Sequence, residues 1–347
     1  MATTYKSLST NDIVTTKTLL HEAIPITGTI ASGSYNTGSP AVEQNIKNYT
    51  HGQFQSIYDY PYLSSSANHI FDMSVGISST SALSGTTGNH KEISKKINMY
   101  NQMTQVLMGY DENGDVQLFD EDGDLIAGGT KLKEVIFFNF ARLITKDEIK
   151  KGTFSIDLAV TEARDVSTPA NMAAAKIKLR DTGAQNDYRV NSPAGDYAIL
   201  YAEEAAGTNV LHSNAQADAK TTKAGLLFYQ AGVAVISASV FMENADGILH
   251  TDLNDTNMNA SNHSIEQLLS GSSITGSCDA IRERVVNISF NNTTELNSTV
   301  YFCRAHHNEF NYSTNPTYLS SSQIFVKNEH SDSPISYITT VGLYSAD

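Results

Sequence analysis

The sequence contains no tryptophan and only two cysteines among its 347 residues. A small secreted domain that is held together by disulfides uses more cysteine, so we expect Cys278 and Cys303 to be free, buried thiols. The first residues lack the apolar core of a secretion signal. The longest nearly uncharged run is too short and too polar to span a bilayer. These absences argue against a secreted disulfide scaffold and against membrane insertion.

Charged residues are scarce as well, because they make up only 17% of the chain. Acidic residues outnumber basic ones, and the formal net charge is −14. A surface this acidic repels phosphate backbones and anionic lipid. Neither nucleic acid nor a membrane is therefore an expected partner.

The common catalytic and nucleotide-binding motifs are missing from the sequence. It has no phosphate-binding loop of the Gly-x-x-x-x-Gly-Lys-Ser/Thr type and no Gly-x-Gly-x-x-Gly turn after a strand. It also lacks the Gly-x-Ser-x-Gly and His-Glu-x-x-His patterns of hydrolases. We therefore expect a protein without catalytic activity and without a cofactor. Paired carboxylates for glycoside cleavage remain an alternative, since acidic residues are numerous.

Two features raise the question of a metal. Acidic turns begin at Asp111 and Asp120, but glycine comes fourth in each, whereas a calcium-binding EF-hand loop needs glycine at its sixth position. Hairpin turns explain these segments better than calcium does. Cys303 lies close in sequence to His306 and His307, and these residue types bind zinc, but a structural zinc site needs four ligands. The same arrangement also suits a Cys–His nucleophile. We expect no metal and place Cys303 in a buried strand.

Residues 225–241 form the longest nearly uncharged run of the chain, and we expect the rest of the fold to be organised around them. In an extended chain both faces of this run carry apolar groups, which is the pattern of a strand buried on two sides. Gly232 interrupts the run and indicates a bulge or a close approach of another backbone segment. The run predicts one or two core strands.

The best helix signal covers residues 90–108. Ile93, Ile97, Tyr100 and Leu107 recur at helical spacing, and Gly109 follows as a stop signal. This amphipathic helix either covers a sheet or packs against a neighbouring subunit. We expect short helices at residues 11–22, at 264–269 and within 141–151.

Most other segments read as strands, so the predicted fold class is mainly β, with antiparallel sheets in a sandwich-like arrangement. Asn-Gly and Asp-Gly turns predict a β-meander over residues 110–126. We expect strands at 133–140, 153–158, 174–179, 197–201, 285–290, 298–303, 323–326 and 335–341. The expected organisation is an N-terminal arm (1–24), a β-rich domain (25–159), a candidate inserted β lobe (160–224) and a C-terminal β domain (225–347).

Clusters of aromatic residues and methionines are the candidate contacts between subunits. Exposed aromatic clusters often mark interfaces between chains. The candidates come from an early aromatic cluster, the long helix and a loop near the C-terminus: Tyr58, Tyr60, Tyr62, Met99, Met103, Phe310, Tyr312 and Tyr318.

Several stretches resemble a virion structural protein of large contractile-tailed bacteriophages. They lie at residues 98–103, 110–115, 137–142, 146–152, 308–318 and 336–344. The resemblance covers most of the chain, is weakest over 160–224, and brings no active-site residues with it. It implies a homo-oligomeric tail or baseplate subunit that is assembled in the host cytoplasm with other virion proteins. The alternatives are a receptor- or glycan-binding tail fibre or adaptor component and a tail-associated glycan hydrolase.

Overall fold

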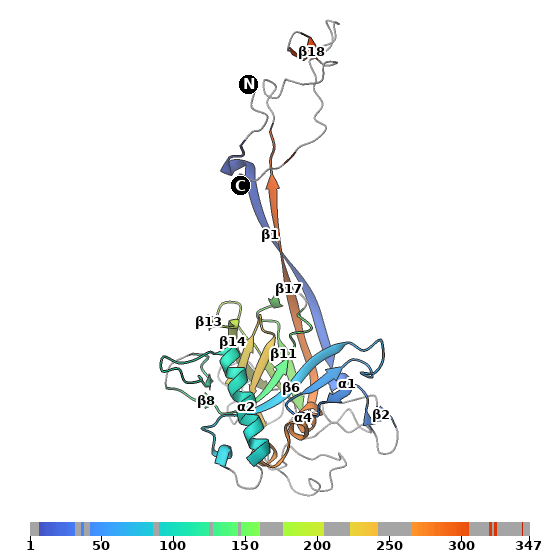
Figure 1. Ribbon diagram of the computed structural model, residues 1–347, viewed down its shortest axis with the longest axis vertical. Helices are drawn as coiled ribbons and strands as arrows, with labels where there is room; N and C mark the ends of the chain where they lie inside the picture. Colours follow the sequence, from blue (N-terminus) through green and yellow to red (C-terminus); the bar gives the residue numbers. More distant parts are fainter. Residues whose placement is uncertain are drawn as a thin grey trace. The chain divides into compact units, whose positions relative to one another are not determined.

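The chain divides into two units that are described separately. Unit 1 contains Met1–Thr18 and Glu295–Asp347, and unit 2 contains Leu19–Thr294. Strands β1 (Ile13–Thr27) and β17 (Val285–Tyr301) contribute residues to both units. The computed structural model (Figure 1) describes residues 7–31, 36–37, 42–85, 90–124, 128–144, 147–159, 176–204, 223–241, 265–304, 319–320, 323–324 and 342.

A 13-stranded sheet forms the framework of unit 2, and its strands come from all four segments that the sequence analysis separates. Their order is β1-β17-β11-β12-β14-β15-β16-β9-β6-β5-β4, with β10 beside β17 and β13 beside β14. The remaining strands are β4 (Ile46–Asn48), β5 (Gln55–Tyr58), β6 (His69–Ile77), β9 (Glu134–Asn139), β10 (Glu148–Ile149), β11 (Ser155–Ala159), β12 (Lys176–Arg180), β13 (Arg189–Ser192), β14 (Gly195–Glu204), β15 (Lys223–Phe228) and β16 (Val233–Ser237).

The apolar run forms the hairpin β15–β16 in the interior of this sheet up to Ser237, as predicted, and its last residues form a 3-10 helix, η4 (Ala238–Phe241). β15 pairs with β14 and β16 pairs with β9, both antiparallel. Gly232 lies in the turn with a φ of 67°, and a Cβ atom there would be 3.2 Å from the backbone nitrogen of Ala141. The predicted close approach of backbone at Gly232 is therefore confirmed.

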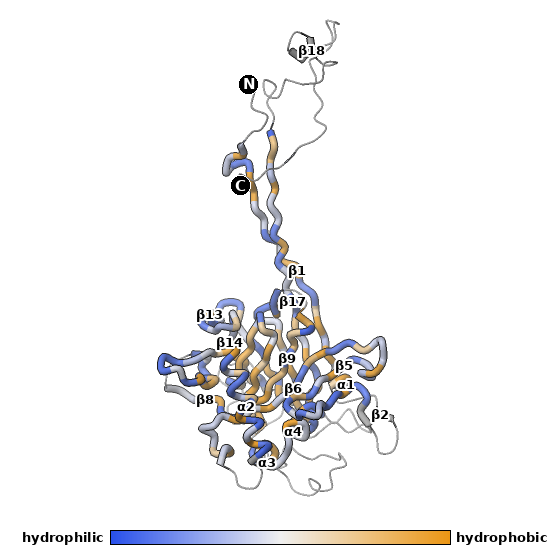
Figure 2. Tube along the Cα trace, in the orientation of Figure 1, coloured by the Kyte–Doolittle hydropathy of each residue, from blue (hydrophilic) through white to orange (hydrophobic). Residues whose placement is uncertain are grey.

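Both faces of the sheet carry an apolar core, which explains why the run is apolar on both sides. Along β9, Ile136 and Phe138 belong to one core, while Val135 and Phe137 belong to the other. Figure 2 shows hydrophobic residues following the strands. The first core includes residues of α3 (Ile265–Gly271) and α4 (Ile274–Arg282), and the second includes residues of α2 (His90–Leu107).

The second core is completed by a small hairpin of β7 (Phe119–Asp120) and β8 (Lys131–Leu132). Other short elements are the 3-10 helices η1 (Thr10–Asp12), η2 (Ala82–Gly85) and η4 (Ala238–Phe241), helix α1 (Gly28–Ala31), and strands β2 (Asn36–Thr37), β3 (Val42–Glu43), β18 (Leu319–Ser320) and β19 (Gln323–Ile324). Within the described residues, none of the helices combines the length and the apolar character that crossing a membrane requires.

The predicted fold class is confirmed, since the protein is mainly β with antiparallel pairing, one prominent helix and a few short ones. The helix predicted at 90–108 is α2, and the one at 264–269 corresponds to α3. The helix predicted at 11–22 is wrong, because β1 begins at Ile13 and its β-branched residues favour an extended chain. The helix expected within 141–151 is also wrong over its described part, since Glu148–Ile149 pairs with β17.

The predicted β-meander is only partly present. Tyr110 and Val116 form an isolated bridge, and Phe119 pairs with Leu132 rather than with a strand inside 110–126. Helix α4 was not predicted, although Ser273 caps it by accepting a hydrogen bond from the backbone N–H of Gly276. The strands expected at 285–290 and 298–303 fall in β17, which ends at Tyr301. Of the strand expected at 323–326, the structure describes Gln323–Ile324, and the strand expected at 335–341 lies outside the described residues.

Candidate interaction surfaces

In unit 1, β1 and β17 form a two-stranded ribbon whose apolar side chains are exposed. The strands are hydrogen-bonded neighbours, and the backbone N–H of Phe302 donates to the carbonyl of Asp12 at 2.8 Å. We call the exposed apolar side chains of this part the ribbon surface: Ile13, Val14, Leu296, Val300, Tyr301 and Phe302, which are 37–55% exposed.

The hydrogen bonds of the ribbon set its register. The side chain of Thr16 donates to the carbonyl of Ser298, and the backbone of Phe302 donates to that of Asp12, so residue numbers fall along one strand as they rise along the other. An antiparallel ladder of this kind places Val14 opposite Val300, and Ile13 opposite Tyr301. Because successive side chains of a strand point to opposite faces, the ribbon carries apolar side chains on both of its faces.

In unit 2, a polar row crosses the strands beside α2, on the face that carries the second core. The register pairs Lys47 with Ser56, Ser56 with Asp72, and Asp72 with Asn139. The next strand continues the row with an apolar residue, Val233. Side chains that lie directly opposite one another in a sheet share one face, so this part of the face is polar.

Asp72 is the centre of a small hydrogen-bond network. Its Oδ1 atom accepts from Ser56 Oγ at 2.5 Å and contacts His69 Nε2 at 2.7 Å. In a nucleophilic triad the imidazole stands between the hydroxyl and the carboxylate and takes the hydroxyl proton. Here the carboxylate stands between the other two groups, so the arrangement does not support such chemistry.

Aromatic rings border the polar row. The rings of Tyr49, His51 and Phe54 lie 4.8–5.2 Å apart between centroids, and Lys47 Nζ lies 4.9 Å from the centroid of the Tyr49 ring. The ring of Tyr58 lies 5.3 Å from that of His69, edge to face. Burial raises the pKa of Tyr58 above its ordinary value. The rings therefore form an aromatic border along the polar row.

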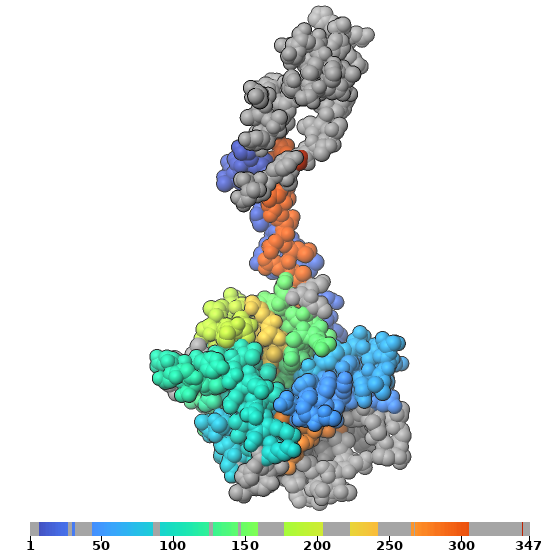
Figure 3. Space-filling model, in the orientation of Figure 1, coloured from blue at the N-terminus to red at the C-terminus, as the bar shows by residue number. Residues whose placement is uncertain are grey.

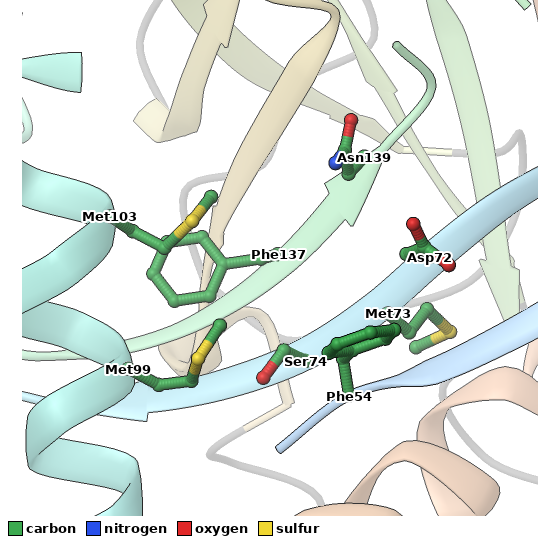
Figure 4. A pocket seen from close by; sticks show the side chains of 8 residues that line it. All are labelled: Phe54, Asp72, Met73, Ser74, Met99, Met103, Phe137 and Asn139. Atoms are coloured by element: carbon green, nitrogen blue, oxygen red, sulfur yellow. The ribbon is translucent and has the colours of Figure 1, made fainter. Parts of the chain in front are cut away.

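A groove of about 290 Å³ separates the polar row from α2 (Figure 4). In Figure 3 the blue surface of the strands β4 to β6 adjoins the green-blue surface of α2. Methionine and phenylalanine side chains form most of its walls, the polar groups of Asp72 and Asn139 lie at one end, and Ser74 lies between Met99 and Phe54. The residues lining this α2 groove are Phe54, Asp72, Met73, Ser74, Met99, Met103, Phe137 and Asn139.

Buried polar contacts fix the elements around the groove. Lys96 of α2 is fully buried, and its Nζ atom donates to the carbonyls of Leu269 at 2.5 Å and Ser272 at 2.7 Å. Burial lowers the pKa of Lys96 to about 8, against smaller opposite effects of Cys278 and Glu92. These contacts tie α2 to the segment that joins α3 and α4.

A second buried cation ties α4 to the sheet. Arg282 donates from its Nε atom to Gln55 Oε1 at 3.1 Å and from Nη2 to Asp279 Oδ1 at 2.9 Å. Gln55 also donates to Asp279 Oδ1, at 2.7 Å. A buried charge is stable only when it is paired and hydrogen-bonded, so this network holds β5 in a defined position beside the groove.

The predicted contact residues fall into three groups. Tyr60 and Tyr62 are exposed, with 48% and 36% of their surface accessible, while Tyr58 is half-buried and its ring centroid lies 6.2 Å from that of Tyr62. Met99 and Met103 line the α2 groove and are partly buried. The third group, Phe310, Tyr312 and Tyr318, lies outside the described residues.

The candidate metal-ligating residues take other roles or lie outside the described residues. Asp111 accepts hydrogen bonds from the backbone of Asn113 and Asp115, and Asp120 pairs with Lys131. Cys278 is buried as expected, but the expectation of a buried strand is wrong for Cys303, which is exposed and follows the end of β17 at Tyr301. His306 and His307 are not described. Over the described ranges, no three His, Cys, Asp or Glu side chains are grouped closely enough to hold a metal.

The polar row and Phe54 were missed by the sequence analysis. The row depends on the pairing of β6 with β9, and nothing in the sequence shows which residues of two distant strands lie opposite one another. The aromatic residues Tyr49 and Phe54 give a weak signal, since both lie close to the predicted cluster at Tyr58.

Comparison with known proteins does not identify a function for these surfaces, because no family model, curated protein or solved structure matches the chain significantly.

Proposed function

We propose that the chain is a non-catalytic structural subunit of a bacteriophage virion, in the tail or baseplate, which assembles with copies of itself and with other virion proteins. The observation that carries this proposal is the ribbon surface of unit 1. An isolated two-stranded ribbon is at best marginally stable in water. A ribbon that exposes apolar side chains on both faces gains stability when other chains cover them.

The exposed apolar area of the ribbon determines how much free energy is gained when other chains cover it. Burial of apolar surface contributes roughly 25 cal/mol per Å² removed from water. Val300 and Phe302 still expose 43% and 55% of their surface, so their burial contributes in every copy that joins the assembly. In a closed symmetric particle the same contact recurs in each subunit, which multiplies a modest gain.

The charge of the ribbon also favours assembly. Over residues 7–18 the chain has one acidic residue, Asp12, and one basic residue, Lys17; over 295–304 it has Glu295 and Arg304. These segments are neutral overall, whereas the whole chain carries −14. Lys17 also forms an ion pair with Glu295. Contact through the ribbon therefore avoids the repulsion that the acidic total would cause between copies.

The resemblance described under the sequence analysis supports the choice of a phage particle. It covers most of the chain and includes the α2 segment and the strand β9 with the turn that follows it. No catalytic arrangement emerges at the Ser56–Asp72–His69 network, which is compatible with a subunit that acts by assembly. We propose the virion as the location of the chain, and the tail or baseplate as its place within the virion.

Quantitative mass spectrometry of purified phage particles that encode this chain tests the proposal. We expect the chain in a fixed integer ratio to the other tail proteins. The variant Val300→Asp is expected to be lost from the particles. Val190→Asp is the matched control, because Val190 is an even more exposed valine of a strand in unit 2. A chain that is absent from intact particles, or equal incorporation of both variants, contradicts the proposal.

A further inference from the structure

The polar end of the α2 groove presents one hydrogen-bond acceptor and one donor side by side. Asp72 and Asn139 are directly opposite in the register of β6 and β9, so their Cβ atoms are about 5 Å apart. Asp72 uses Oδ1 for Ser56 and His69, and Oδ2 has no partner among the described residues. Asn139 uses Oδ1 to accept from the backbone N–H of Ala141 at 3.0 Å, which leaves its Nδ2 amide to donate.

Apart from Ser74, whose hydroxyl donates to the carbonyl of Gln53 at 2.6 Å, the rest of the groove is apolar and fits a ring-sized group. Phe54 and Phe137 supply aromatic rings, and Met99 and Met103 supply flexible thioether side chains from α2 (Figure 4). Methionine adapts its shape to a ligand and is frequent at binding surfaces. A volume of about 290 Å³ is at the small end of ligand pockets, so the groove takes a group of about one ring.

These features select among classes of ligand. A phosphate or carboxylate is disfavoured by the negative charge of Asp72. An alkylamine pairs with Asp72 but leaves the amide of Asn139 unsatisfied. A pyranose ring has an apolar C–H face for an aromatic ring, and two neighbouring hydroxyls that each donate and accept. Of these three classes of ligand, only the pyranose uses the acceptor of Asp72, the donor of Asn139 and the aromatic wall together.

We propose that the α2 groove binds one pyranose ring of a glycan, with two neighbouring hydroxyls on Asp72 Oδ2 and Asn139 Nδ2 and the apolar face of the ring against Phe54. The inference goes beyond the assembly role and does not rest on it, since all of these residues belong to unit 2 and none belongs to the ribbon surface.

The binding test uses the purified full chain with methyl pyranosides of glucose, galactose and mannose as probes. This set contains vicinal hydroxyl pairs in both the equatorial–equatorial and the axial–equatorial arrangement, so it covers the geometries that the groove can read. With methyl-labelled methionine, saturable shifts of the Met99 and Met103 resonances are expected for at least one probe. If no probe shifts them, or if n-butylamine does so while the pyranosides do not, the proposal is wrong.

Isosteric exchanges then test the two polar groups. Asp72→Asn retains an oxygen for Ser56 and His69 but removes the free acceptor, and Asn139→Asp retains the acceptor for Ala141 but removes the donor. Each is expected to weaken sugar binding about 10-fold or more. The double exchange restores one donor and one acceptor, and hydroxyls can satisfy either order, so binding is expected to recover in part.

Two exposed turn residues provide the controls. Asp115→Asn and Asn113→Asp make the same chemical changes outside the groove, and both are expected to bind as the unmodified chain does. Thermal unfolding of every variant separates loss of binding from loss of fold. If the two groove exchanges leave the affinity unchanged while the wild-type chain binds sugar, Asp72 and Asn139 are not the contacts and the assignment is overturned.

Discussion

Strand β17 has two parts that differ sharply in the surroundings of their apolar residues. Within unit 2, Val285, Ile288 and Phe290 are at most 1% exposed, and they belong to the first core. Within unit 1, Leu296 and Val300 of the same strand are 48% and 43% exposed. An apolar, β-branched sequence forms a strand in both parts, but only in unit 2 does the described part of the chain bury its side chains.

This difference teaches that strand formation and burial are separate properties of the sequence. In unit 2 the helices of the chain supply the second layer that any sheet face needs. In unit 1 the described residues supply a ribbon without such a layer. We therefore expect unit 2 to determine the unfolding free energy of the free chain, and unit 1 to become more stable when the chain assembles.

The largest expected effect is on the core of unit 2. Phe140 is fully buried, and its ring lies 5.3–6.3 Å from the rings of Phe71, Phe138, Phe154 and Phe290. Phe140→Ala is expected to lower the free energy of unfolding by about 3–5 kcal/mol. Denaturant unfolding of the dilute chain measures this.

Phe302→Ala is the matched change in unit 1, since this side chain is 55% exposed. Its expected cost in the dilute chain is less than about 0.5 kcal/mol. Equal losses for Phe140→Ala and Phe302→Ala would remove the contrast between the two units.

The second effect depends on pH and on the buried Lys96. Its pKa is lowered from 10.5 to about 8, so between these values the folded chain releases a proton that the unfolded chain still holds. Stability therefore rises with pH in this window. We expect the unfolding free energy of the wild-type chain to gain about 2 kcal/mol relative to Lys96→Met between pH 8 and pH 10.

The comparison with Lys96→Met cancels the contribution of the buried tyrosines, whose raised pKa values act in the opposite direction above pH 10. Denaturant unfolding of both proteins at several pH values gives the difference. A difference that stays constant from pH 8 to pH 10 would show that Lys96 keeps an ordinary pKa in the folded chain.

A third, smaller effect concerns the turn of the central hairpin. Gly232 has a φ of 67°, which alanine adopts at a cost of about 1 kcal/mol, and its Cβ atom would meet the side chain of Ile144. Because of both the positive φ and this contact, Gly232→Ala is expected to lower the melting temperature. Gly114→Ala, at another positive φ but with open space around the Cβ position, separates strain from the close approach. A larger loss for Gly114→Ala would contradict the packing described for the hairpin.

The smallest effect is expected for polar changes in the ribbon surface. Val14→Thr combined with Val300→Thr retains the β-branched shape and is expected to alter the unfolding free energy of the dilute chain by less than about 0.5 kcal/mol. Calorimetry of the dilute chain checks this value. A loss of 2 kcal/mol or more would mean that these valines are already buried in the free chain.

The sequence predicted best those elements whose pattern has a single explanation. The spacing of Ile93, Tyr100 and Leu107 fits only a helix, and the helix is present. The uniform apolar character of 225–241 needs burial on both faces, and the hairpin has it. Helix α4 was within reach too, because Ser273 is a suitable cap and Ile274, Cys278 and Ile281 recur at helical spacing.

Other features could not be predicted in the same way. Residues 13–18 alternate weakly because their apolar side chains point to both faces, so the leucines that follow suggested a helix instead of a strand. The α2 groove depends on the register that sets Asp72 opposite Asn139, and on the packing of α2, which brings Met99 and Met103 to the same groove. Register is decided by pairing between segments that are distant in sequence, which residue patterns within each segment do not contain.

Hydrogen exchange of the ribbon amides, at residues 13–18 and 295–301, tests the central claim most directly. The measurement compares the dilute chain with the purified phage particle and uses the amides of β15 and β16 as the internal reference. The account predicts fast exchange of the ribbon amides in the dilute chain, slow exchange of the reference in both samples, and at least about 100-fold slower ribbon exchange in the particle. Ribbon amides that exchange equally fast in both samples, beside a protected reference, would contradict it.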